Sequence, residues 1–227
     1  YCDTGRYPLA INAAMRVVRY WLKILKMDKD RLPRRVYEML LKNMEIENNW
    51  AYKLSALLKE NGCEEVWENQ KVESESSFLC YLKDSLINKF IEQWMQEMNR
   101  SSRYEIYRSF KQTLEIEAYL YKVDKKVFRE VLVKFRFGIS DLYIHKHRYD
   151  VMLETVCPLC QEEDEDEYHI LIRCPAVSDL RLKYILPHVI ENGNLFEYLM
   201  RSEEQTILRA LSTYLYHVLK RRESAKN

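Results

Sequence analysis

The sequence predicts a mainly α-helical fold, a multi-helix domain with a small C-x2-C-x8-H-x4-C zinc knuckle near its C-terminal end. Three observations predict it. Only 4 glycines and 5 prolines occur among 227 residues, which is too few turn-forming residues for a many-stranded sandwich or barrel. Apolar residues recur every three or four positions along most of the chain, as on one face of a helix. One irregular stretch carries cysteine and histidine at the spacing of metal ligands.

The first half of the chain predicts four helices. Apolar residues at Ile11, Met15, Val18, Leu22 and Leu25 define the first. Later helices begin near Pro33 and near Asn48 or Asn49, and a long amphipathic one follows an exposed link over 68–77. The inner faces expected for these three helices are Val36, Met39, Leu40 and Met44; then Trp50, Leu54, Leu57 and Leu58; then Phe78, Leu82, Leu86, Phe90, Trp94 and Met98.

The second half predicts a short strand, more helices and the knuckle. LEIEAYLY (114–121) alternates enough to suggest the strand. A helix closed by Gly138 follows, and the last helix turns Leu208, Leu211, Leu215 and Val218 inward. The expected organisation is a helical domain over 1–150, the knuckle with its following helix over 151–186, and a C-terminal helix packing on the rest over 187–227.

The composition also limits the function classes. Neither G-x-G-x-x-G nor G-x-x-x-x-G-K-[ST] occurs, which excludes the Rossmann and P-loop nucleotide sites. No apolar run approaches the 18 or so residues of a membrane span, so no membrane partner is expected. Six scattered cysteines favour free thiols or metal ligation in a reducing compartment. We expect an intracellular protein, nuclear or cytoplasmic, and a segment of a longer chain because it begins with Tyr1.

One group of residues has the spacing of a metal site. Cys157 and Cys160 are three positions apart, and His169 and Cys174 follow. Two thiolates, an imidazole and a third thiolate suit tetrahedral zinc, and four protein ligands leave no open position, so the expected role of the metal is structural. Three buried thiols beside an incidental histidine are the alternative.

The loop between the ligand pairs contains six consecutive acids, Glu162 to Glu167. The simpler interpretation is a solvated loop with spare negative charge. The alternative is that one carboxylate accepts the outer ring N–H of His169 and so orients the imidazole.

Charge is unevenly distributed although the net charge is +1. Residues 1–60 carry 12 basic and 7 acidic side chains, and 101–150 carry 11 and 7. Just before the knuckle, basic residues alternate with the aromatics Phe135, Phe137, Tyr143 and Tyr149, a pattern that suits phosphate contact with base stacking. The candidate nucleic-acid contacts are Lys134, Arg136, His145, Lys146, His147 and Arg148. An ordinary basic helix end with core aromatics is the alternative.

An ordered series of motifs resembles the region that follows the polymerase in reverse transcriptases of non-LTR (LINE-type) retrotransposons. It covers about residues 5 to 186 and ends in the most specific element. The series is GRYPL (5–9), YWLK (20–23), NWAYKLSALLKENG (49–62), EVWENQ (65–70), YRSFK (107–111), EAYLYK (117–122), KFRFGISDLYIHKHRY (134–149), CPLCQEEDEDEYHILIRCP (157–175) and LRLKYI (180–185).

The resemblance implies a non-catalytic tail of an RNA-directed DNA polymerase. It implies ligand duty for Cys157, Cys160, His169 and Cys174, and contact with RNA or DNA during target-primed reverse transcription. It also implies the upstream polymerase portion as a partner. The polymerase requires an Asp-Asp pair to hold its metal ions, and none occurs here, so no catalysis is expected of this segment.

A protein-interaction module that docks on the polymerase body is the second functional hypothesis. It rests on the near-neutral net charge and on the 17 tyrosines and 4 tryptophans, since these residue types are enriched at protein interfaces.

Overall fold

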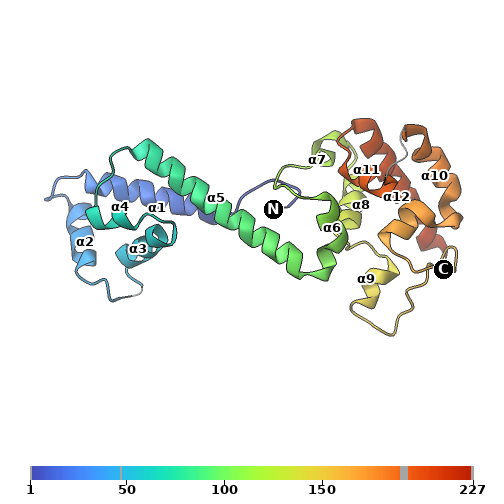
Figure 1. Ribbon diagram of the computed structural model, residues 1–227, viewed down its shortest axis with the longest axis horizontal. Coiled ribbons are helices and arrows are strands. Elements are labelled where there is room, and N and C mark those ends of the chain that lie inside the picture. Colours follow the sequence, from blue (N-terminus) through green and yellow to red (C-terminus); the bar gives the residue numbers. More distant parts are fainter. Residues whose placement is uncertain (1, 47, 190–193, 226–227) are drawn as a thin grey trace. The chain divides into compact units, whose positions relative to one another are not determined.

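The computed structural model describes residues 2–46, 48–189 and 194–225, and over these residues the chain is mainly helical (Figure 1). The predicted fold class is therefore confirmed. The helices are α1 (Leu9–Leu25), α2 (Leu32–Leu41), α3 (Trp50–Glu60), α4 (Glu64–Asn69), α5 (Glu75–Arg100), α6 (Glu105–Phe110), α7 (Tyr119–Lys122), α8 (Lys126–Arg136), α9 (Tyr143–His147), α10 (Ser178–Tyr184), α11 (Leu195–Arg201) and α12 (Gln205–Ala225), with short 3-10 turns at Ser102–Tyr104, Pro175–Val177 and Leu186–His188 and a π-helical turn at His169–Arg173.

The chain divides into two compact units, and the division lies inside α5. Tyr7–Met95 forms one unit, which we call the N-terminal unit. Gln96–Asn227 together with Tyr1–Arg6 forms the other, the knuckle unit. This division differs from the expected boundary near residue 150, because α8 packs against α12 and so shares a core with residues far beyond that boundary.

The N-terminal unit is built around the buried face of α1. Val18 and Trp21 are fully buried, and they pack with Leu54 and Leu58 of α3 and with Leu82 of α5. The Trp21 indole donates a hydrogen bond of 2.9 Å to the hydroxyl of Tyr37. Burial of these large side chains supplies the main stabilisation of this unit.

The predicted inner face of α2 is confirmed in part, since Leu40 and the following Met44 pack against the core of the N-terminal unit. Val36 and Met39 are exposed, whereas Tyr37 is buried and donates to the Gln70 side chain over 2.6 Å. Tyr37 can be buried because its hydroxyl finds partners inside the unit. A ten-residue helix has few apolar positions, so its periodicity does not fix which face turns inward.

Helix α3 begins where the sequence predicted, at the N-cap Asn49. The Asn49 side chain accepts a hydrogen bond from the amide of Ala51 over 2.7 Å and so caps the helix N-terminus. Gly62 follows the C-terminus with a left-handed φ of 72°, a conformation that glycine adopts without steric cost.

The core of the knuckle unit lies around α8 and α12. Leu208, Leu211, Leu215 and Val218 of α12 are all buried, as predicted. They pack with α8, α10 and α11 (Figure 1). The Tyr214 hydroxyl donates to the carbonyl of Ile170 over 2.6 Å, which ties α12 to the segment that carries the last two predicted ligands.

The first residues of the chain belong to the knuckle unit. The amide of Glu117 donates to the carbonyl of Asp3 over 2.8 Å. Gly5 has φ +60°, and a Cβ there would lie 2.6 Å from the amide nitrogen of Ile116. Only glycine allows this close backbone approach.

The strand expected within 114–121 does not form. Its second half is the short helix α7, and Glu117 lies directly before that helix with its amide bonded to Asp3. Among the described residues the backbone pairing of β type is a single antiparallel bridge between Val156 and Asp164. None of the described helices has the length and apolarity to cross a membrane.

Candidate metal centre

The four predicted ligands meet at one point. One ligand atom each from Cys157, Cys160, His169 and Cys174 lies within 4.8 Å of the other three. The Sγ atoms of Cys157 and Cys174 are 4.0 Å apart, and Sγ of Cys160 is 3.4 Å from Nε2 of His169. Cys157, His169 and Cys174 are fully buried. This cluster could hold a metal ion.

A tight turn brings the first two cysteines together. The amide of Cys157 donates to the carbonyl of Glu163 over 2.8 Å, and the amide of Gln161 donates back to the carbonyl of Cys157 over 2.9 Å. Gln161 has a φ of 60°, which reverses the chain just after Cys160. Both thiols therefore project from one short loop.

The second pair is set by the π-helical turn His169–Arg173. The amide of Cys174 donates to the carbonyl of His169 over 2.7 Å, so the five-residue hydrogen bond places both side chains on one side of the backbone. π-Helical turns often occur at functional sites.

The outer nitrogen of His169 faces a carboxylate. Nδ1 lies 3.1 Å from Oε2 of Glu163, and Nε of Arg173 lies 3.2 Å from the same oxygen. This contact leaves Nε2 directed at the cluster. The alternative weighed for the acidic loop, a carboxylate that orients the imidazole, is what the structure contains.

The thiol pair favours a cation at its centre. The hydrogen bond from the neighbouring Cys174 thiol lowers the pKa of Cys157, and the same contact raises the pKa of Cys174. Two buried thiolates 4.0 Å apart would repel each other, so a bound cation would be needed for both to ionise.

The acidic loop is only partly the solvated loop of the simpler interpretation, because its first three acids are exposed and the next three are not. Glu165 and Glu167 are fully buried. The carboxylate of Glu165 pairs with the guanidinium of Arg222 and accepts the amide of Tyr143 over 2.7 Å. Asp166 accepts the amide of His169 over 2.5 Å. These acids hold the loop in place instead of adding surface charge.

Arg222 was missed by sequence reasoning, although a signal was present. It continues the buried series Leu211, Leu215 and Val218 at the next helical spacing. A charged residue at an interior helix position indicates a buried partner, and here the partner is Glu165.

The expectation that Arg136 contacts nucleic acid is corrected by its burial. Its exposed fraction is 3%, and its guanidinium lies 2.6 Å from Glu117, 3.5 Å from Asp3 and 2.5 Å from the carbonyl of Met200. It also stacks over the ring of Phe110. The Lys111 ammonium pairs with Glu117, and the hydroxyls of Tyr107 and Tyr119 donate to Asp3. Arg136 is the centre of this buried network and is not available to phosphate.

His145 is corrected for the same reason. It is 5% exposed, and its Nε2 lies 2.7 Å from Oε1 of Glu167. The Cβ that Gly138 lacks would lie 3.2 Å from Cε1 of the ring, so the imidazole is enclosed by backbone and by the acidic loop.

The other four candidates stay nearer the surface. Lys134 and Arg148 are exposed, while Lys146 and His147 are half-buried. Lys146 pairs with Asp141 over 2.8 Å, and Nδ1 of His147 lies 2.8 Å from the carbonyl of Leu153. Arg148 donates weakly to the carbonyl of Gly138. Lys134 and Arg148 are therefore the most accessible cations of the predicted set.

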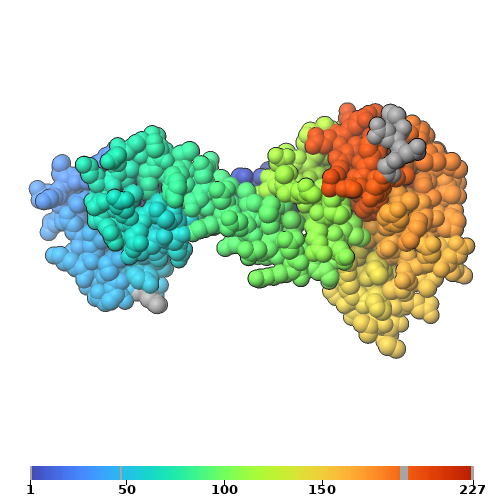
Figure 2. Space-filling view, in the orientation of Figure 1, coloured from blue at the N-terminus to red at the C-terminus, as the bar shows by residue number. Residues whose placement is uncertain are grey.

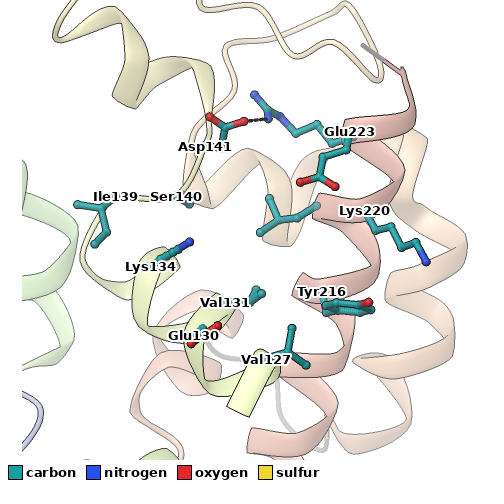
Figure 3. A pocket seen from close by; sticks show the side chains of 12 residues that line it. Val127, Glu130, Val131, Lys134, Ile139, Ser140, Asp141, Tyr216, Lys220 and Glu223 are labelled. Atoms are coloured by element: carbon teal, nitrogen blue, oxygen red, sulfur yellow. Dashed lines mark hydrogen bonds and ion pairs between the residues drawn. The ribbon is translucent and has the colours of Figure 1, made fainter. Parts of the chain in front are cut away.

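Lys134 lines a cavity of about 650 Å³ between α8 and α12 (Figure 3). Val127 and Val131 face Tyr216 across it, and Ile139 lies at its edge. Its cations include Lys220 and Arg222, and its acids are Glu130, Asp141 and Glu223. Charges of both signs balance here, so the cavity does not favour an anionic ligand.

Comparisons of this chain with family models, curated proteins and solved structures gave no match.

Proposed function

We propose that the chain is a non-catalytic nucleic-acid-binding tail of a retroelement-type reverse transcriptase, organised by one structural zinc ion. The single observation that carries this proposal is the convergence of three cysteines and a histidine on one point. The ordered motif series from GRYPL to HILIRCP supports the retroelement origin, by resemblance.

The distances in the cluster support zinc as the metal. Bond lengths of about 2.3 Å to sulfur and 2.0–2.1 Å to nitrogen give tetrahedral edges of about 3.8 Å between sulfurs and 3.6 Å between sulfur and nitrogen. The corresponding distances are 4.0 and 3.4 Å. When bound, the ion would crosslink the turn of Cys157 and Cys160 to the turn of His169 and Cys174. Four protein ligands would leave no coordination position for a reactive water, so the ion would have a structural role.

The nucleic-acid proposal rests on the exposed side chains beside the knuckle. Arg148 is exposed, and Tyr149 next to it is 85% exposed. An exposed cation beside an exposed aromatic ring suits a phosphate with its base, because the base can stack on the ring. Lys134 adds a further exposed cation on α8. Figure 2 shows the segment around these residues, in yellow, at the surface of the knuckle unit.

The metal is tested by elemental analysis of protein purified without chelator. We expect one zinc per chain, and the double variant Cys157→Ser with Cys160→Ser should lose it. Cys80→Ser is the matched control, because Cys80 is exposed and outside the cluster. Wild-type protein without metal would overturn the zinc assignment.

Nucleic-acid binding is tested by fluorescence anisotropy with labelled single-stranded RNA and duplex DNA between 50 and 200 mM salt. Affinity should fall steeply with salt because bound phosphates release counterions. Lys134→Glu with Arg148→Glu should weaken binding and flatten the salt dependence. An affinity that does not change over this range would contradict the proposal.

A protein-docking role is the second candidate, and one observation favours it. Val151 and Met152 are 72% and 88% exposed beside Tyr149. Two hydrogen bonds hold the turn that carries them. The side chain of Asp150 accepts the amide of Met152 over 3.1 Å, and the carbonyl of Asp150 accepts the amide of Leu153. Val151→Ser with Met152→Ser should then weaken association with the polymerase portion supplied in trans, while RNA affinity is kept.

A further inference from the structure

Helix α1 of the N-terminal unit has a solvent-facing side on which all the charged groups are basic. Arg16, Arg19 and Lys23 are exposed and follow one another at spacings of three and four residues. No aspartate or glutamate occurs from 4 through 27. We call Arg16, Arg19 and Lys23 the α1 stripe.

The opposite side of α1 fixes the direction in which the stripe points. Met15, Val18 and Leu22 are buried against α3, α4 and α5. The helix cannot roll without exposing them, so the three cations are held on the outside. For the same reason α1 cannot place an apolar face in a lipid surface, which membrane-bound amphipathic helices require.

The stripe residues, unlike Lys26 and Arg34, have no acidic partner among the described residues. Lys26 pairs with Glu75 over 2.9 Å, and Arg34 pairs with Glu38 over 2.9 Å. Within residues 2–46, 48–189 and 194–225, no ion pair involves any of the three stripe residues. Their charges remain available to an external anion.

An aromatic ring lies within the stripe. Tyr20 is 49% exposed and stands four residues after Arg16 and three before Lys23. Its inner edge is supported by Trp50 of α3, with ring centroids 6.2 Å apart. A supported, half-exposed ring between cations is the arrangement that stacks a base while the cations hold its phosphates.

We propose that the α1 stripe binds the phosphate backbone of nucleic acid, as a contact surface separate from the knuckle unit. From Arg16 to Lys23 the helix rises about 10.5 Å, which matches about three steps along a duplex strand. Two of the three cations are arginines, whose planar guanidinium groups bind phosphate in a bidentate manner. The inference extends the proposed function but does not require the metal centre.

The test is charge reversal with a matched control. Arg16→Glu, Arg19→Glu and Lys23→Glu form the stripe variant. Lys53→Glu, Lys71→Glu and Lys83→Glu form the control, because these exposed lysines belong to the same unit and give the same change in net charge. Anisotropy with a labelled 30-nucleotide single strand and its duplex is measured between 50 and 200 mM salt.

The stripe variant should lose at least about tenfold in affinity at 50 mM salt, and the salt slope should fall by about 3 because about three phosphate contacts are lost. The control should lose much less. A variant with glutamine at Arg16, Arg19 and Lys23, whose helical content is checked by circular dichroism, should also bind the nucleic acid more weakly than the wild-type chain. Equal losses in the stripe and control variants, or an unchanged slope, would overturn the proposal.

The same experiment separates this inference from the proposed function. In the Cys157→Ser, Cys160→Ser background the effect of the stripe variant should persist. If charge reversal of the stripe weakens binding and Lys134→Glu with Arg148→Glu does not, the stripe proposal is supported and the proposed contact through Lys134 and Arg148 is overturned. If only Lys134→Glu with Arg148→Glu weakens binding, the stripe proposal is overturned and the proposed function is kept. Binding to phosphatidylserine vesicles with no binding to nucleic acid would also overturn it.

Discussion

Glu163 connects the acidic loop to the candidate metal centre by two contacts. Its carbonyl accepts the amide of Cys157, and its carboxylate lies 3.1 Å from Nδ1 of His169. In the tautomer with its proton on Nδ1, the imidazole donates to this carboxylate and its Nε2 lone pair faces Cys160. The residue therefore positions one ligand through its backbone and another through its side chain.

Glu163→Gln should lower zinc affinity by about 10- to 100-fold, because the carboxylate that orients His169 is lost. Competition with a chromophoric chelator measures the change. Glu162→Gln is the control, since Glu162 is its exposed neighbour. Equal affinities in the two variants would show that the His169 contact does not tune the site.

The ligands could be predicted from the sequence at the scale of single residues, but the buried charges could not. Cysteine and histidine spacing directly reflects the geometry of a tight metal site. The burial of Arg136 depends on Asp3 and Glu117, and no local pattern relates residues so far apart. A basic residue beside aromatics has the same appearance in sequence whether the group faces solvent or a buried carboxylate.

Helix α12 connects the acidic loop to the core of the knuckle unit. Arg222 is 1% exposed, pairs with Glu165 and lies over the ring of Tyr143 with 4.9 Å to its centroid. The carboxylate of Asp141 lies 3.3 Å from the same guanidinium, and a dashed line at Asp141 marks this contact in Figure 3. The C-terminal helix thus holds the loop that follows the first two candidate ligands, Cys157 and Cys160.

Arg222→Ala should destabilise the chain by about 3–5 kcal/mol, because Glu165 would remain buried without a cation. Urea unfolding measures the loss. Arg209→Ala on the same helix is the control, since Arg209 pairs with Asp124 at the surface and such pairs contribute about 1 kcal/mol or less. A similar small loss in both variants would refute the role of Arg222.

The neighbouring Arg221 has a pH-dependent effect. Its guanidinium binds both carboxylate oxygens of Asp179 at 2.7 Å and links α12 to α10. This contact holds the pKa of Asp179 at about 2, below the usual 3.8. Because the pKa is lowered by folding, the stabilisation is present above 3.8 and is lost as the pH falls through about 2.

Carboxyl NMR titration should place the Asp179 midpoint near 2 in the wild-type chain, and Arg221→Gln should return it toward 3.8. Asp124 is a useful internal comparison because it pairs with an arginine of the same helix. An Asp179 midpoint that does not respond to the substitution would contradict the assigned cause.

Long amphipathic helices were the most predictable elements. The buried faces of α1 and α12 agree with the periodicity, because many turns average out single exceptions. The short α2 was predicted with a partly wrong face and α7 with a wrong type, since their conformation depends on the Tyr37 and Asp3 contacts made by distant residues.

The whole molecule has two separate cores, which gives a prediction for metal removal. A chelator should increase amide hydrogen exchange over residues 155–175 and in α12, which is tied to them by Arg222 and Tyr214. Helices α1 and α3 should keep their protection, since their core belongs to the other unit. Mass spectrometry of exchanged peptides measures both. Loss of protection in α1 would contradict independent cores.

The position of the division between units could not be predicted from composition. It lies in the middle of α5, a helix of 26 residues without an internal Pro or Gly. Composition marks linkers, which are rich in such residues, and a continuous helix leaves no such mark.

The tie between Asp3 and the residues around Glu117 also determines the order in which the chain can fold during synthesis. Tyr7–Met95 is continuous in sequence, so every residue that forms its core is present once residue 95 has been made. The residues that hold Asp3 extend to Arg136, about 40 residues later, or about 2 to 8 s at common rates of translation. Asp3 is therefore made before the N-terminal unit but reaches its native contacts only after all the residues of that unit have been made.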